Sequence, residues 1–215
     1  MTDQPNFSND YRYADTAAAH TQLYLWNHVI DEIELYFSRT SDGRAVFDLG
    51  CGNGSLLADL DRRGYQVVGI DPSISGIEQC KLRRPPVRAE VGSAYDDLKA
   101  KYGAYPVVVS LEVVEHVYYP KLYAKSLYSL VAPDGIAVVS TPYHGYLKNV
   151  ALAVSGKMDS HFTALWDHGH IKFWSVRTLT QLLMDAGFSD VRFRFAGRTK
   201  WLAKSMIAIA RRREI

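Results

Sequence analysis

The stretch that determines the architecture is Val46-Phe47-Asp48-Leu49-Gly50-Cys51-Gly52-Asn53-Gly54-Ser55. It joins an apolar strand pattern to a loop that has almost no side chains. The three glycines let the chain turn sharply, and they leave backbone N–H groups facing outward where a helix begins near Ser55. The stretch therefore predicts a strand, a binding loop and a helix. The alternative is a tight turn with a purely architectural role.

The next strand pattern indicates what this loop binds. Residues Gln66–Ile70 end at Asp71, about 20 residues past the first glycine, where a nucleotide-binding βαβ unit places the carboxylate that takes ribose hydroxyls. The two features together favour a nucleoside ligand. A dinucleotide fingerprint has glycine or alanine at the position of Ser55. An NAD-dependent oxidoreductase is therefore a weaker reading.

The rest of the chain alternates strand and helix patterns, which implies a parallel sheet with helices on both faces. We expect a single Rossmann-like α/β domain with a seven-stranded, mostly parallel sheet and a C-terminal antiparallel hairpin. The centre of the sheet is the apolar run Pro106–Ser110, and Asp190–Phe195 and Lys204–Ile209 form the hairpin. The expected parts are an N-terminal helical cap (1–40), a cofactor-binding core (41–142), a lid insertion (143–173) and a C-terminal helix with a strand pair (174–215).

Composition narrows the classes of partner. The chain has 215 residues with 47% hydrophobic and 22% charged side chains, which suits one globular domain. A formal net charge of +2 does not favour nucleic acid. Two cysteines make no disulfide framework, and no leader or membrane-spanning run is evident. We expect a cytoplasmic monomer or homodimer with a small-molecule partner and no stable membrane insertion.

A second group of polar residues follows the central strand. Glu112, Glu115 and His116 stand at i, i+3 and i+4, so one helical turn would place them on one face. Open α/β sheets bind ligands at this end of their strands. Two carboxylates and an imidazole can hold a divalent cation or tune the histidine as a base. The alternative is a helix start whose glutamates favour the helix dipole while His116 contacts backbone.

The segment from Tyr143 to about Phe173 is the longest without an evident role in the sheet. Most connections in compact domains run about 4 to 6 residues, and a longer one is usually functional. We expect this segment to be a substrate lid. Its candidate substrate contacts are Tyr143, His144, Trp166, His168 and His170.

The motifs Asp48–Gly54 (DLGCGNG) and Gly69–Ser73 (GIDPS) closely resemble the first two motifs of the class I S-adenosylmethionine-dependent methyltransferases. The resemblance runs in motif order from about Val46 to Gly187. It implies S-adenosylmethionine as cofactor, with its methionine part over the glycine loop and its ribose on Asp71. The implied cofactor contacts are Asp48, Gly50, Cys51, Gly52, Asn53, Gly54, Asp71, Pro72, Ser73, Ala94, Tyr95, Asp96, Leu111 and Glu112.

Two further features follow from this resemblance. An acid in the loop Gly92–Asp97 would contact the exocyclic amine of adenine, with Asp96 the first candidate and Asp97 the second; helix capping is the alternative. Such chains also commonly fold an N-terminal segment over the cofactor. The implied lid residues there are Tyr11, Arg12, Tyr13 and His20, and an ordinary capping helix is the alternative reading.

A narrower resemblance comes from Ser110–His116, Ser140–Pro142 and Asp167–Phe173, which look like the O-methyltransferases of ubiquinone biosynthesis, enzymes that methylate polyprenyl catechols. The Glu-x-x-Glu-His element also resembles small-RNA 3′-terminal 2′-O-methyltransferases, where with a further histidine it binds a divalent metal. In both resembling groups the implied fourth contact lies after the fifth strand, so His168, His170 or His144 would complete such a site here. The expected activity is methyl transfer to oxygen of a small aromatic or hydroxylated acceptor, with Glu112, Glu115 and His116 as catalytic residues or metal ligands. The alternatives are the RNA enzyme and a non-catalytic nucleoside-binding module.

Overall fold

The predicted seven-stranded sheet is present in the computed structural model, which describes residues 11–17, 20–167, 169–197 and 202–213. Its strand order is β3-β2-β1-β4-β5-β7-β6. Strands β3, β2, β1, β4 and β5 run parallel to one another, and β7 is antiparallel to both β5 and β6. The strands are β1 (Ala45–Leu49), β2 (Gln66–Asp71), β3 (Ala89–Val91), β4 (Tyr105–Leu111), β5 (Val131–Pro142), β6 (Ser189–Ala196) and β7 (Ser205–Arg211).

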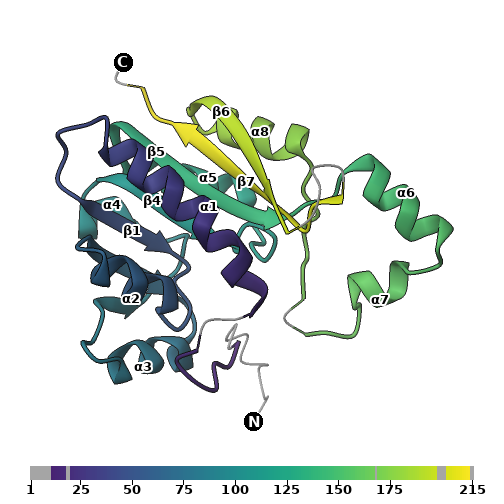
Figure 1. Cartoon of the computed structure of the whole chain (residues 1–215), viewed down its shortest axis with the longest axis horizontal. Helices are drawn as coiled ribbons and strands as arrows, with labels where there is room; N and C mark the ends of the chain where they lie inside the picture. Colours follow the sequence, from purple (N-terminus) through teal and green to yellow (C-terminus); the bar gives the residue numbers. More distant parts are fainter. Residues whose placement is uncertain (1–10, 18–19, 168, 198–201, 214–215) are drawn as a thin grey trace, which may run out of the picture.

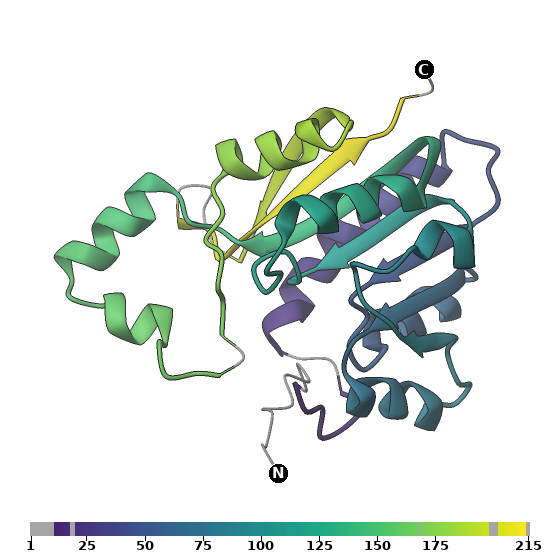
Figure 2. The same cartoon turned by 180° about the vertical axis from the view of Figure 1, so that it is seen from behind.

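Helices cover both faces of this sheet, as predicted (Figure 1). They are α1 (His20–Phe37), α2 (Ser55–Arg62), α3 (Ile74–Leu82), α4 (Leu98–Tyr102), α5 (Pro120–Leu130), α6 (Tyr146–Val154), α7 (Met158–Phe162) and α8 (Val176–Asp185). Helices α1, α2 and α3 lie on one face, and α4, α5 and α8 lie on the other (Figures 1 and 2). Among the described helices, none combines the length and the apolar character needed to cross a bilayer.

The core consists of two layers, one on each side of the sheet. Successive side chains of a strand point to opposite faces. Val107 and Val109 therefore pack under α1 and α2, while Val108 between them packs under α5, and all three are fully buried. Burying a valine side chain stabilises the fold by roughly 1.5 to 3 kcal/mol. The unbroken apolar run in the sequence is explained by this burial on both faces.

Strand β5 begins earlier than the sequence predicted. Pro133, Asp134 and Gly135 are residues typical of a turn, which would place the start of the strand at Ile136, but β5 already begins at Val131 and contains them. Asp134 takes a left-handed φ of 59°, and the register with β4 shifts between Tyr105 and Val107. The turn residues therefore form an irregularity inside the strand, because the chain on either side of them still pairs with β4.

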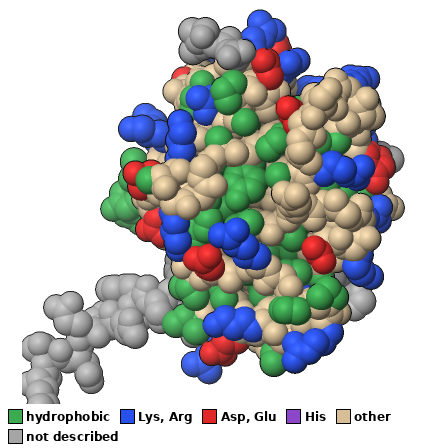
Figure 3. All heavy atoms as spheres, turned by 90° about the vertical axis from the view of Figure 1, so that its left-hand side faces the viewer, with side chains coloured by type: hydrophobic (Ala, Val, Ile, Leu, Met, Phe, Trp, Pro, Cys, Tyr) green, Lys and Arg blue, Asp and Glu red, His purple; other side chains and the backbone are tan. Residues whose placement is uncertain are grey.

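The segment of residues 143–173, called the arm below, contains helices α6 and α7 where the sequence analysis expected a substrate lid. Helices α6 and α7 extend away from the sheet (Figures 1 and 2). Neither helix has a buried side chain. On the opposite side of the molecule, basic and acidic side chains are interspersed over the visible face (Figure 3).

Candidate active site

The glycine loop between β1 and α2 is held tightly against its surroundings. The N–H groups of Gly50 and Cys51 both donate to the carbonyl oxygen of Ile70, at 2.8 and 2.9 Å. Gly50 and Gly52 have φ values of 93° and 54°, and a Cβ on Gly50 would lie 2.4 Å from Cγ2 of Val113. Glycine is therefore required at position 50 by conformation and by space. The same contact places the loop after β4 directly against the glycine loop.

Asp71 connects the end of β2 to this loop. One carboxylate oxygen accepts the N–H of Gly52 and the other accepts the N–H of Ser73, each at 2.8 Å. Burial raises the pKa of Asp71, although these two hydrogen bonds oppose the rise. Asp48 is also buried, and burial followed by the charge of Asp71 raises its pKa to about 8. Two acids beneath the loop suit a ligand that carries positive charge and ribose hydroxyls.

An entry strap, residues 11–17, lies across the glycine loop. The side-chain amide of Asn53 donates to the carbonyls of Asp15 and Ala17, at 2.9 and 2.8 Å. The hydroxyl of Ser73 donates to the carbonyl of Tyr11 at 2.6 Å. A Cβ on Gly52 would lie 2.5 Å from the hydroxyl of Tyr13. The strap thus has the position expected of a cover over the cofactor loop.

The other two residues implied for the cover are placed differently. Arg12 is exposed, and His20 begins α1, where its side chain lies outside the described residues. Burial, followed by the charge of Asp71, raises the pKa of Tyr13, so this phenol stays protonated and can donate a hydrogen bond. Tyr13 is therefore the strap residue best placed to touch a ligand.

In the loop Gly92–Asp97, which was predicted to contact adenine, both acids accept hydrogen bonds from nearby backbone N–H groups. Asp96 accepts the N–H of Ser93 at 2.8 Å, and Asp97 accepts the N–H of Ala100 at 3.3 Å as the N-cap of α4. Asp97 therefore caps a helix, which was the alternative reading. Asp96 stabilises a turn, and its carboxylate keeps further lone pairs for hydrogen bonding. The hydroxyl of Tyr95 accepts the N–H of Tyr119 at 3.1 Å. Ala94 is half-buried, and Pro72 at the end of β2 is exposed.

The predicted helical turn after β4 is wrong. Residues 112–119 form a loop, and Glu112 takes a left-handed φ of 55°. Its N–H donates to the carbonyl and to the hydroxyl oxygen of Ser140, and its carboxylate accepts the Ser140 hydroxyl at 2.8 Å. Burial raises the pKa of Glu112 to about 7. Glu112 therefore points to β5, away from the face it was expected to share with Glu115 and His116.

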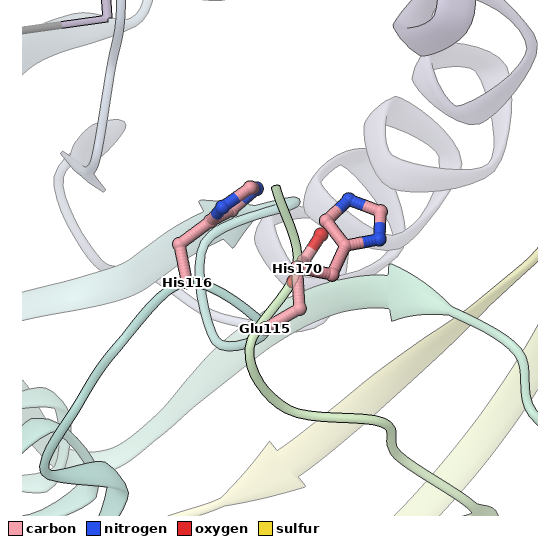
Figure 4. A group of neighbouring side chains, drawn as sticks. All are labelled: Glu115, His116 and His170. Carbon is pink, nitrogen blue, oxygen red and sulfur yellow. The ribbon is translucent and has the colours of Figure 1, made fainter. Parts of the chain in front are cut away.

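A different trio comes together instead. Glu115, His116 and His170 each offer a ligand atom, and these atoms lie within 4.8 Å of one another. Glu115 and His116 come from the loop after β4, and His170 comes from the end of the arm (Figure 4). Of the predicted metal set, Glu112 lies apart from this cluster, whereas His170, one of the histidines implied for the further contact, lies beside Glu115 and His116.

Glu115 is the unusual member of this cluster. Its side chain is buried, and neither carboxylate oxygen has a hydrogen bond of ordinary geometry within the described part of the chain. Burial, followed by the charge of Glu112, raises its pKa. Burial also lowers the pKa of His170 to about 4, so that imidazole is neutral at neutral pH. An unpartnered buried carboxylate beside neutral imidazole is a donor set that suits a cation.

Backbone hydrogen bonds fix the two segments that form the cluster. The N–H groups of Ile171 and Lys172 both donate to the carbonyl of Glu115 at 3.0 Å. The indole N–H of Trp174 donates to the carbonyl of Val114 at 3.1 Å. The sequence analysis missed Trp174 and also Ser140, which orients Glu112. Trp174 pairs with a residue 60 positions away and Ser140 with one 28 positions away, and no local pattern reports either contact.

The other predicted substrate residues separate into two groups. The ring of His144 packs with the rings of Phe162 and Phe173, at 5.8 and 5.1 Å between centroids, and Trp166 lies 6.1 Å from His170. Tyr143 instead packs against Phe195 of β6. Burial lowers the pKa of His144 to about 4. His168 lies outside the described residues.

A sheet of this order, with a glycine loop after its first strand and an acid after its second, defines the class I S-adenosylmethionine-dependent methyltransferases. The family described as Methyltransferase domain matches residues 18–192, and the chain belongs to it. The cofactor of this class is S-adenosylmethionine, as the sequence resemblance implied.

Curated relatives are named as ubiquinone biosynthesis O-methyltransferases. The protein from Bradyrhizobium diazoefficiens is 32% identical over 150 residues, which cover 66% of this chain and 57% of the relative. The protein from Psychrobacter arcticus is 27% identical over 180 residues, covering 76% and 68%. The chain thus spans little more than half of the first of these relatives.

A solved structure with a similar fold is that of magnesium protoporphyrin IX methyltransferase from Synechocystis PCC 6803 with bound S-adenosylhomocysteine. Its TM-score is 0.67 at 20% sequence identity, with 93% of this chain and 90% of that chain covered. At this level of identity the likeness concerns the fold.

Proposed function

We propose that this protein transfers the methyl group of S-adenosylmethionine to an oxygen atom of a small aromatic or hydroxylated acceptor. The observation that carries the proposal is the Glu115 carboxylate, which is buried beside two imidazoles and makes no hydrogen bond of ordinary geometry within the described chain. The cluster follows β4, whose next residues pack on the glycine loop through Val113 and Gly50. The methyl donor and the acceptor would therefore meet where the loop after β4 touches the glycine loop. The name of the curated relatives supports oxygen as the acceptor atom.

The cofactor loop and strap would bind S-adenosylmethionine. Asp71 keeps lone pairs for the ribose hydroxyls while its oxygens accept the two backbone N–H groups. The positive charge of the sulfonium and ammonium groups would in turn favour the ionised forms of the buried acids Asp48 and Asp71, whose pKa values burial raises. A sulfonium leaving group already activates the methyl, so the protein has mainly to align donor and acceptor and to exclude water.

The cluster fits a divalent cation, because carboxylate and imidazole atoms converge there and the carboxylate is unpartnered. Glu115, His116 and His170 would hold the cation, which lowers the pKa of a coordinated hydroxyl when bound. Without a cation, the imidazole of His116 would accept the proton of the acceptor directly. The rings of His144, Phe162 and Phe173 would contact an aromatic acceptor.

The test is turnover with catechols, phenols, alcohols and aromatic amines, with the methylated atom located by nuclear magnetic resonance. We expect O-methylated products. His116→Ala and His170→Ala should each lower turnover by about 10² to 10⁴, the usual contribution of one acid–base group, while S-adenosylmethionine affinity is retained. His28→Ala on α1 is the matched control and should leave turnover unchanged. Loss of activity on chelation, restored by Mg²⁺ or Zn²⁺, selects the cation; indifference to chelators selects His116 as the base.

Three outcomes contradict the proposal. Methylation of amines alone would exclude oxygen as the acceptor atom. Methylation of the 3′-terminal ribose of RNA, without turnover of small molecules, would support the RNA enzyme. Wild-type turnover by His116→Ala and His170→Ala would make the cluster structural.

A further inference from the structure

A pocket of about 450 Å³ lies where the C-terminal ends of α2 and α3 meet the entry strap. Its walls include three arginines, Arg62, Arg83 and Arg84, and one acid, Asp61, which gives them a net charge of +2. The strap reaches the pocket at Thr16. None of the residues implied as cofactor contacts lines it. The pocket is therefore a second place where the chain could bind a ligand, behind the cofactor loop.

Two of the arginines contact the ends of their own helices. Arg62 donates from Nε to the carbonyl of Ala58 and from Nη2 to the carboxylate of Asp59. Arg84 donates from Nη1 to three carbonyls at the end of α3. Such contacts are a usual role of arginine at a helix C-terminus and are the alternative to ligand binding. They use only part of each guanidinium, because within the described residues Nη1 of Arg62 and both Nε and Nη2 of Arg84 have no partner.

The third arginine connects the pocket to the cofactor loop. Arg83 donates from Nε to the carbonyl of Asn53 at 2.9 Å and from Nη2 to the carbonyl of Thr16. One guanidinium thus holds the glycine loop and the strap together. Its Nη1 has no acceptor in the part of the chain that the structure describes. Arg83 therefore keeps donors for a ligand while it bridges these two segments.

Two of the three positive charges have no acidic partner among the described residues. Arg83 and Arg84 bond there to backbone carbonyls alone, whereas Arg62 pairs with Asp59 at 3.0 Å. Arg83 is also half-buried, and burial, together with the charge of Arg62, lowers its pKa. A guanidinium that is partly removed from water is stabilised by an anion. Phosphate matches best, because its oxygens fit the planar fork of arginine.

We propose that this pocket binds a phosphate group, free or carried by a small phosphorylated molecule, and that the bound phosphate strengthens cofactor binding. The second part rests on the cofactor site proposed above. The phosphate oxygens would accept hydrogen bonds from the remaining nitrogens of Arg62, Arg83 and Arg84. Nε and Nη2 of Arg83 keep their carbonyl acceptors, so the anion would fix this side chain between the strap and the glycine loop without displacing either.

Calorimetry in phosphate-free buffer tests the site itself. The probes are inorganic phosphate, pyrophosphate and ribose 5-phosphate, with chloride at matched ionic strength as the control. We expect all three probes to bind and chloride not to bind. Pyrophosphate should bind about tenfold more tightly than phosphate, because its greater charge and extra oxygens engage more of the arginine donors. Binding of ribose 5-phosphate alone would identify a carried phosphate as the ligand, and binding of all three would identify the phosphate group itself.

Single substitutions test which arginines hold the anion. Arg62→Gln and Arg84→Gln should each weaken pyrophosphate binding by at least about tenfold, because each removes a charged donor. Arg63→Gln is the matched control, since Arg63 stands next to Arg62 and also pairs with Asp59 but does not line the pocket. It should bind pyrophosphate as the wild type does. Equal losses in the three variants would show a response to overall charge and would overturn the site.

The coupling is measured by titrating S-adenosylmethionine with and without saturating pyrophosphate. We expect pyrophosphate to raise the affinity by about fivefold or more, and by linkage the cofactor should raise the affinity for pyrophosphate by the same factor. The rise should disappear in Arg83→Gln, which lacks the charge that joins the pocket to the glycine loop and the strap. Arg63→Gln should retain the full rise.

The outcomes separate this inference from the proposed function. Protein that binds S-adenosylmethionine but none of the three probes would overturn the phosphate pocket and leave the cofactor site intact. Pyrophosphate that binds without changing the cofactor affinity would overturn the coupling. Protein that binds pyrophosphate through the arginines but does not bind S-adenosylmethionine would remove the cofactor site instead. Tight binding of single-stranded RNA, with no response to the small phosphates, would replace the pocket by a nucleic-acid surface.

Discussion

At the scale of the residue, Asp71 shows how one side chain can have two roles. The sequence predicted its position at the end of the second strand and its contact with ribose. It could not predict that the carboxylate also accepts the N–H groups of Gly52 and Ser73, because these bonds depend on how the loop folds back. Asp71 therefore shapes the loop, and its contact with the ribose stays a prediction.

Replacing Asp71 should test both roles at once. Hydrogen bonds to a charged group contribute roughly 1.5 to 3 kcal/mol each, so Asp71→Ala should weaken S-adenosylmethionine binding on the order of ten- to a hundred-fold. Isothermal titration calorimetry measures this directly. Asp61→Ala, an exposed acid at the end of α2, is the control and should bind as the wild type does. Unchanged affinity in Asp71→Ala would remove Asp71 from the cofactor site.

Glu112 marks the limit of prediction at this scale. The spacing of Glu112, Glu115 and His116 indicated a common helical face, and that inference assumed a helix directly after β4. The hydroxyl of Ser140 and the left-handed backbone of Glu112 produce a loop instead. Neither is visible in the local pattern, because Ser140 lies 28 residues away.

At the scale of the element, the sequence pattern predicted β1, β2 and the C-terminal helix α8 well, since each is a regular run that buries one face or both. It does not define α6 and α7 clearly, because neither helix buries a side chain in the core. The long N-terminal helix was also predicted. The sequence did not predict how α1 attaches to β6 at the edge of the sheet, because the arginines that pair with the acids of α1 lie about 160 residues away.

The attachment of α1 depends on a buried acid. Glu32 is 1% exposed and pairs with Arg192 and Arg194 of β6. Burial alone would raise its pKa, but the two arginines outweigh burial, and its pKa lies below the usual value. A lowered folded-state pKa means that the stabilisation is complete above the unfolded value of about 4.3 and is lost as pH falls through the folded value.

Urea denaturation should therefore show that Glu32→Gln lowers the free energy of unfolding by about 1.5 to 3 kcal/mol at pH 7. The difference from the wild type should shrink as the pH is lowered towards the folded pKa of Glu32. Glu34→Gln, an exposed acid on the same helix that pairs with Arg63, should change stability by less than about 0.5 kcal/mol. Equal effects of the two substitutions, or a Glu32 effect independent of pH, would contradict this account of the attachment.

At the scale of the whole molecule, the sequence predicted the sheet because the methyltransferase motifs occur in chain order and each motif ends a strand. The direction of the arm did not follow from any motif. Its two ends are fixed to the body, since the N–H of Tyr143 donates to the carbonyl of Lys204 and the N–H of Ile171 donates to the carbonyl of Glu115. The helices between these ends make few contacts, and His170 stands at the point where the arm rejoins the body.

This arrangement predicts unequal stability across the chain. Backbone hydrogen bonds open more readily where few apolar side chains are buried, so α6 and α7 should exchange their amide hydrogens much faster than Val107–Val109 of β4. If the arm closes over a bound acceptor, adding S-adenosylmethionine and acceptor should slow exchange in α6 and α7. Hydrogen–deuterium exchange mass spectrometry measures both effects, with β4 as the internal control. Exchange in the arm as slow as in β4, with no response to ligands, would mean that residues 143–173 are a fixed part of the fold and that the acceptor binds elsewhere.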